Sequence, residues 1–82
     1  MIDKQAALEI ANKFFAEKNQ SKVAKLLEAP THWICYDGPA DRVIYGKAGI
    51  KIDKETGQTE LFILPNKENF ELLHKAVPVD IA

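Results

Sequence analysis

The segment Asp53-Lys54-Glu55-Thr56-Gly57 constrains the fold of this chain most strongly. Before it, residues 50–53 alternate apolar and charged side chains with a period of two, as a half-buried strand does. The segment itself suits a type I turn followed by a left-handed residue, a position that glycine occupies without steric cost. Residues 58–64 then form the partner strand, which Pro65 ends. The sequence therefore predicts an antiparallel hairpin with Gly57 at positive φ.

An amphipathic helix is expected over residues 4–18. Asp3 is a good N-cap, because its carboxylate can accept hydrogen bonds from the amides of the first turn. The apolar residues that follow fall at helical spacing, and they are Ala7, Leu8, Ile10, Ala11, Phe14 and Phe15. We expect Phe14 to be largely buried against a sheet.

A second, short helix is expected near the C-terminus. Asn66 can cap it, and Pro78 ends it. Its apolar positions recur at spacings of three and four: Phe70, Leu73, Ala76 and Val77. Residues 22–29 are ambiguous, because their propensity favours one or two helical turns while a short edge strand is the alternative.

The segment from His32 to Tyr36 is rich in aromatic and branched residues, which is typical of a strand. Trp33 and Cys35 then share one face of that strand, and we expect them to point inward with Tyr36 half exposed. Residues 37–41 have the composition of a turn, and residues 42–45 resume extended character.

Together these elements indicate one α+β domain over residues 1–82. We expect the N-terminal helix and the short C-terminal helix to pack on one face of a three- to four-stranded antiparallel meander. A chain of 82 residues has a thin core, so a deep buried active site is not expected.

The charge and the cysteine content exclude several classes of function. Eleven Lys and Arg against twelve Asp and Glu give a net charge of −1, so no nucleic-acid partner is expected. The single cysteine, Cys35, excludes an internal disulfide and fits a reducing compartment. No segment approaches the roughly 20 apolar residues of a membrane span. The expected location is the cytoplasm, with no membrane association.

Few residues offer catalytic or metal-binding chemistry. His32 and Cys35 lie three apart, a spacing that sends them to opposite faces of a strand, so we expect no metal and no cofactor. A nucleophilic dyad of Cys35 and His74 is the enzymatic alternative. Free cysteines in strands are usually small core residues, so we expect the chain not to be an enzyme.

The candidate partner-binding residues lie on and after the aromatic strand: Tyr36, Asp37, Asp41, Arg42 and Tyr45. Exposed loop charges and aromatic residues can bind a partner without supporting the core. In the alternative interpretation, Asp37 and Asp41 only shape turns and Arg42 is solvated.

Three segments resemble the YrhB-like family of small bacterial immunity proteins, which accompany polymorphic toxins. Residues 3–11 resemble its opening helix, residues 32–36 its aromatic central strand, and residues 50–57 its hairpin. Where that family usually has Gly-Asn-Ala-Pro, this chain has Gly46-Lys47-Ala48-Gly49. The resemblance implies stoichiometric binding of a toxin domain, with no catalytic residues.

Three functional hypotheses follow. The first is an immunity protein that neutralises a cognate toxin by binding it. The second is a small chaperone-like or regulatory module that forms a homodimer through a sheet edge. The third is a small enzyme that uses Cys35 or His74.

Overall fold

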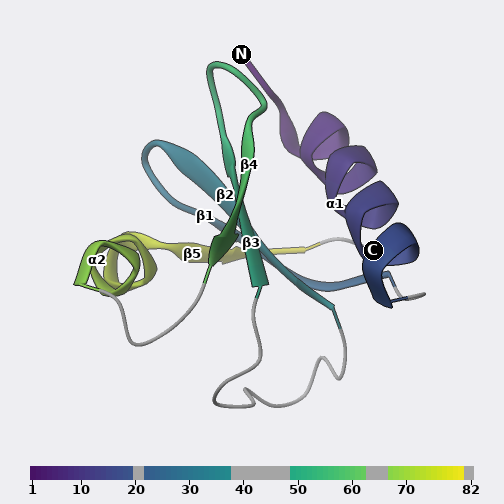
Figure 1. The fold of residues 1–82 in the computed structure, drawn as a ribbon. Helices are drawn as coiled ribbons and strands as arrows, with labels where there is room; N and C mark the ends of the chain where they lie inside the picture. Colours follow the sequence, from purple (N-terminus) through teal and green to yellow (C-terminus); the bar gives the residue numbers. More distant parts are fainter. Residues whose placement is uncertain (20–21, 38–48, 63–66, 81–82) are drawn as a thin grey trace.

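The computed structural model describes residues 1–19, 22–37, 49–62 and 67–80. They form one antiparallel sheet with the strand order β4-β3-β2-β1-β5, together with two helices (Figure 1). The elements in chain order are α1 (Lys4–Asn19), β1 (Val23–Glu28), β2 (His32–Asp37), β3 (Gly49–Asp53), β4 (Thr59–Phe62), α2 (Lys67–Lys75) and β5 (Val77–Val79). The expected α+β class is confirmed.

Two details of the expected architecture are wrong. The described residues form a sheet of five strands, because β5, which follows β4 in the chain, crosses over to the outer side of β1. The helices lie on opposite faces of the sheet, with α1 on one side and α2 on the other (Figure 1). The physical reason is visible in β2, where Cys35 and its neighbour Ile34 are both fully buried although they point to opposite faces.

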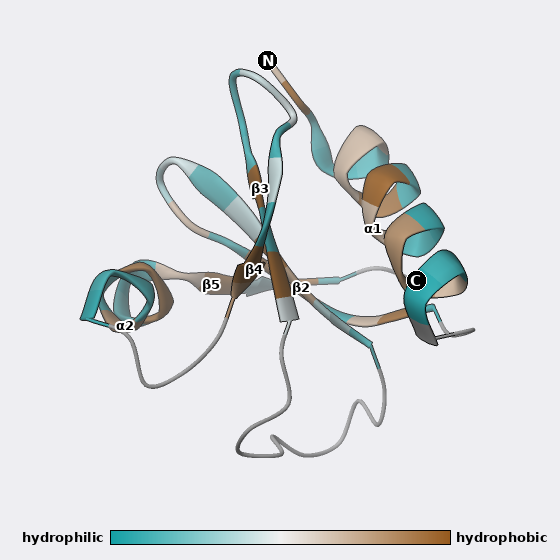
Figure 2. Ribbon diagram, in the orientation of Figure 1, coloured by the Kyte–Doolittle hydropathy of each residue, from teal (hydrophilic) through white to brown (hydrophobic). Residues whose placement is uncertain are grey.

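The expected helix α1 is confirmed, and it begins as predicted at Lys4, with Asp3 as its N-cap. The Asp3 carboxylate accepts a hydrogen bond of 2.9 Å from the backbone N–H of Ala6, which satisfies an amide of the first turn. Figure 2 shows that the apolar residues of α1 lie towards the sheet. Phe15, not Phe14, is the fully buried aromatic. The reason is that Ala7, Ala11 and Phe15 form the i, i+4 row that contacts the sheet, whereas Phe14 lies beside that row.

Within residues 22–29, the segment Val23–Glu28 forms a strand in place of the favoured helical turns. This strand, β1, is not at an edge, because it pairs with β2 on one side and with β5 on the other. Leu26 is buried towards α1 and Leu27 towards α2, so both faces of the strand contribute to a core. Strand pairing and burial on two faces therefore override the helical propensity of the segment.

The predicted hairpin between β3 and β4 is confirmed. The N–H of Asp53 donates to the carbonyl of Gln58 at 2.9 Å, and Gly57 has a φ of 76°. The Asp53 carboxylate accepts hydrogen bonds from the backbone N–H groups of Glu55 and Thr56, which lower its pKa. Asp53 thus stabilises the turn through its backbone contacts.

The C-terminal helix is shorter than expected. It ends at Lys75, and Val77 belongs to β5 and not to the helix. Pro78 does not simply stop the helix, since it lies in β5 at the edge of the sheet, where a missing N–H is tolerated. Phe70 is 49% exposed, so the side of α2 that packs on the sheet consists of Asn69, Leu72 and Leu73 instead.

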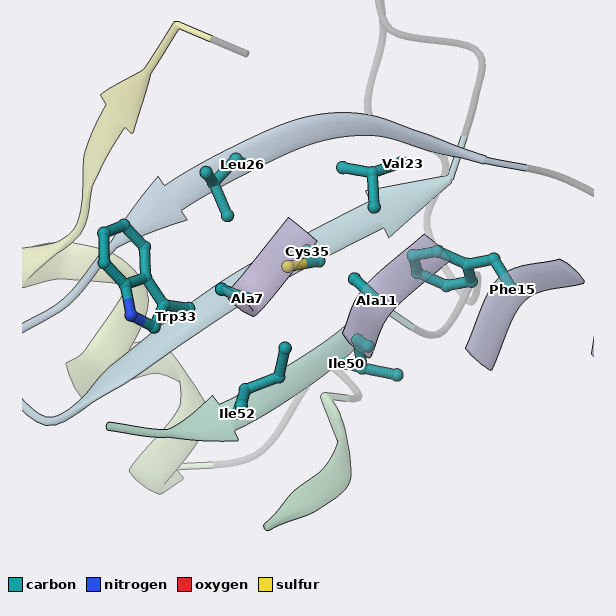
Figure 3. Packing of buried hydrophobic residues seen from close by; sticks show 9 residues of the cluster. All are labelled: Ala7, Ala11, Phe15, Val23, Leu26, Trp33, Cys35, Ile50 and Ile52. Carbon is teal, nitrogen blue, oxygen red and sulfur yellow. The ribbon is translucent and has the colours of Figure 1, made fainter. Parts of the chain in front are cut away.

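Each face of the sheet has its own apolar cluster. The cluster under α1 consists of Ala7, Ala11, Phe15, Val23, Leu26, Trp33, Cys35, Ile50 and Ile52 (Figure 3). The cluster under α2 consists of Leu27, Ala29, Ile34 and Phe62, with Tyr36, Leu72, Leu73 and Ala76 packed against it.

Candidate interaction surface

The two side chains that suggested catalysis lie on opposite faces of the sheet. Cys35 is fully buried under α1, and burial raises the pKa of its thiol to about 12. His74 is exposed on α2, which covers the other face. A protonated thiol without access to an imidazole cannot act as an activated nucleophile. The described part of the chain therefore does not form the Cys35–His74 dyad.

His32 and Cys35 are separated in the same way. Cys35 points towards α1, while His32 lines a groove beside α2 and contacts the Thr31 hydroxyl at 2.7 Å. The residues that the structure describes contain no group of three His, Cys, Asp or Glu side chains that could hold a metal ion.

Trp33 points inward, as predicted, and its polar and apolar parts both have partners within the chain. Its indole N–H donates to the carbonyl of Ile2 at 3.0 Å, and the Lys54 ammonium lies 5.0 Å from the ring centroid. Lys54 also binds the carboxylate of Glu28 at 2.8 Å. Trp33 is 6% exposed, so its role in this structure is to attach the N-terminal residues to the sheet.

Tyr36 is half buried, as predicted, and packs against the core under α2. Its ring meets that of Phe62 edge to face, with 6.1 Å between the centroids. Gly49 lies next to it, and a Cβ atom there would be 2.8 Å from the tyrosine ring. Burial also raises the pKa of the Tyr36 hydroxyl. Through these contacts Tyr36 packs the core under α2, in addition to any contact with a partner.

The other predicted contact residues are placed differently. Asp37 is the last residue of β2 and is buried, so the expectation that it begins an exposed turn is wrong. Its strand pairing with Val23 extends β2 by one residue beyond the aromatic segment. Asp41, Arg42 and Tyr45 lie outside the described residues.

The structure reveals a surface that the sequence reasoning missed. Leu61 is 55% exposed on β4, the outermost strand beside β3. It pairs with Ile50, which belongs to the cluster on the α1 face, so the side chain of Leu61 lies on that same face of the sheet. Leu61 and Phe62 are consecutive apolar residues, so they point to opposite faces of the sheet, but which of them is buried depends on the strand order. Phe62 is the buried one.

A groove of about 290 Å³ lies between α2 and the sheet. It is lined by Pro30, Thr31, His32, Lys51, Glu68, Glu71, Leu72 and Lys75, which carry charges of both signs. Lys51 already has partners there, since its ammonium donates to the Asn69 side-chain oxygen at 3.0 Å and lies 3.8 Å from Glu60. We therefore interpret the side chains that line the groove as a polar contact between α2 and the sheet.

No family model, curated protein or solved structure matches this chain. Among the described residues, no helix has the length and apolar character needed to cross a membrane.

Proposed function

We propose that this chain is a protein-binding domain of the immunity type, which neutralises a toxin by stoichiometric binding. The main observation that supports this proposal is the position of Leu61, a large apolar side chain that is 55% exposed on an outer strand. Outer strands with exposed apolar residues are sites where another chain can pair. The resemblance of residues 3–11, 32–36 and 50–57 to the YrhB-like family supplies the toxin as the kind of partner.

The placement of the reactive groups supports binding over catalysis. Cys35 is buried with a raised pKa under α1, and His74 lies across the sheet from it. The dyad form of the enzymatic hypothesis needs these two side chains to meet, so that form gains no support from the described residues. The cytoplasm is the location that suits such an inhibitor, because there it protects the cell that makes the toxin.

A growth competition tests the proposal in the organism that encodes the chain. We expect a strain without the gene to be inhibited by contact with its parent strain, and a plasmid copy to restore growth. The purified chain should then bind the responsible toxin at a 1:1 ratio in calorimetry. Normal growth of the deletion strain, combined with turnover of a small molecule that Cys35→Ser or His74→Ala abolishes, would overturn binding in favour of catalysis.

A further inference from the structure

The two outer strands of the sheet differ in their ability to accept a further strand. β5 has three residues, and its central residue, Pro78, has no backbone N–H to donate. β4 has four residues, Thr59–Phe62, without a proline. Proline and short length are features that protect a sheet edge from pairing. Within the described residues, β4 is therefore the edge that remains suited to pairing.

The hydrogen-bonding pattern of the hairpin shows which groups of β4 face outward. Asp53 donates to Gln58, which makes these two residues a hydrogen-bonded pair. In an antiparallel ladder such pairs alternate with non-hydrogen-bonded ones. Glu60 therefore bonds across to Lys51, and the N–H and C=O groups of Thr59 and Leu61 point away from β3.

The side chains of β4 define what kind of strand would fit. Leu61 is exposed on the α1 face of the sheet, the face against which the partly buried Ile10 and Phe14 of α1 also pack. Glu60 lies on the α2 face with its side chain 60% exposed, and its carboxylate is 3.8 Å from the Lys51 ammonium. This edge thus offers an apolar contact on one face and a largely exposed carboxylate on the other.

We propose that β4 binds an extended segment of the partner protein as a sixth, antiparallel strand. In that segment an apolar residue lies opposite Leu61, and the next residue, opposite Glu60, is Lys or Arg. Directly opposed side chains on neighbouring strands interact, so an aliphatic pair and an opposite-charge pair set the register. This inference rests on the proposed protein-binding function and names the chemistry of the partner.

A second copy of this chain fits the edge less well. In a symmetric pairing of β4 with itself, outward-facing residues must oppose each other, and two such registers pair at least three residues of the strand. In one, Leu61 opposes Leu61 and Glu60 opposes Phe62 of the other copy. In the other, Glu60 opposes Glu60, which is repulsive. Neither register gives Glu60 a cation, so the charge pattern favours a different protein.

A capped peptide, acetyl-Ser-Thr-Val-Lys-Thr-Ser-amide, tests the proposal as the probe. It is titrated to millimolar concentration into the ¹⁵N-labelled chain and followed by NMR. We expect saturable shifts of the amides of Thr59–Phe62 and none at Val77 or Val79. The matched control peptide has Glu in place of Lys, and it should bind more weakly. Shifts centred elsewhere, no saturable shifts, or equal binding of both peptides would overturn the proposal.

Two variants sharpen the test. Thr59→Pro removes an outward-facing N–H without affecting the ladder to β3, and it should weaken peptide binding about three- to tenfold, as the loss of one hydrogen bond does. Glu60→Lys should reverse the preference, so that the Glu peptide binds more tightly than the Lys peptide. Val77→Ala changes the other edge and should leave binding as it is. If Thr59→Pro does not fold, the test depends on Glu60→Lys alone. A Glu60→Lys variant that still binds the Lys peptide more tightly than the Glu peptide refutes the proposal.

The same variants separate this inference from the proposed function. A toxin that binds Glu60→Lys and wild type equally well would show that β4 is not the contact, while protein binding itself stands. A concentration-dependent dimer in sedimentation that Thr59→Pro abolishes would show that the edge is occupied by a second copy, which contradicts the proposed partner strand.

Discussion

The two faces of the sheet are built differently. Among the described residues, the buried cluster between α1, a helix of 16 residues, and the sheet has nine members, which are apolar or, for Cys35, weakly polar. The α2 face has a buried cluster of four residues under a helix of nine residues. Its contact also contains the buried Asn69, which accepts a hydrogen bond from Lys51. Because apolar burial is the main favourable term in folding, we infer that the α1 face supplies most of the stability.

The two faces also differ in the size of the side chains through which each helix packs on the sheet. On α1, the small residues Ala7 and Ala11 are fully buried, and Figure 3 shows them over Cys35 and the neighbouring strand. Such small side chains let a helix lie close to a sheet. On α2, only Asn69 is buried, and Leu72 and Leu73 are partly exposed. We therefore expect substitutions in α2 to be tolerated better than substitutions in α1.

The largest loss of stability is expected from a substitution on the α1 face. Phe15→Ala should destabilise the chain by about 3–5 kcal/mol, the usual range for removing a buried aromatic side chain. This is close to the total stability of a small domain, so urea unfolding should show a large loss or no folded state. Phe14→Ala is the matched control, because Phe14 is only partly buried and should cost clearly less. Equal costs for the two variants would contradict the packing of α1.

The next largest loss of stability is expected from a substitution on the α2 face, at the start of β3. A Cβ atom at Gly49 would lie 2.7 Å from the backbone oxygen of Cys35 and 2.8 Å from the Tyr36 ring. Gly49→Ala should therefore cost about 1–3 kcal/mol, as overpacking does. In a Tyr36→Ala background the cost should fall, since one of the two clashes is removed. A double-mutant cycle with additive effects would contradict the close contact between Gly49 and Tyr36.

A smaller effect is expected at the tip of the hairpin. Gly57 has a φ of 76°, and a Cβ atom there would lie 2.9 Å from the side chain of Ile2. Gly57→Val should cost about 1 kcal/mol or more in the free energy of unfolding, because an L-residue is strained in this conformation. Gly57→Asn is the control, since asparagine tolerates left-handed conformations better. Equal loss in both variants would argue against backbone strain as the cause.

The smallest effect is the pH dependence that Cys35 confers. Burial raises the thiol pKa to about 12 in the folded chain, from the value of 9.0 expected for an unburied thiol. The stabilising contribution of the protonated thiol is complete below the unfolded pKa and is lost as the pH rises from there through the folded pKa. Between pH 8 and 9.5 the loss should be about 1 kcal/mol. Urea titrations of wild type and Cys35→Ala measure it, and an identical alkaline loss in both would contradict the burial of the thiol.

The local chemistry of the sequence predicted several elements correctly. The cap at Asp3, the hairpin with Gly57 and the inward direction of Trp33 and Cys35 follow from short-range patterns that the structure reproduces. These features depend on backbone conformation or on alternation within one strand. They are therefore visible without knowledge of the partners across the fold.

The remaining features depend on contacts that a single sequence does not reveal. Residues 23–28 have helical propensity, yet they form a strand because both neighbours, β2 and β5, offer pairing. The side on which α2 packs depends on Ile34 and Leu27 being buried on the face opposite Cys35. The exposed Leu61 became visible only when the strand order placed β4 at an edge.

Native-state hydrogen exchange, followed by NMR at increasing urea, tests most directly whether the α1 face supplies most of the stability of the fold. The amides of Ile34, Cys35 and Ile50 should exchange only through global unfolding. The amides of Leu72 and Leu73 in α2 should exchange through a local opening that requires less free energy. Exchange of the α2 amides at the same free energy as those of β2 and β3, or earlier opening of α1, would contradict the asymmetry between the two faces.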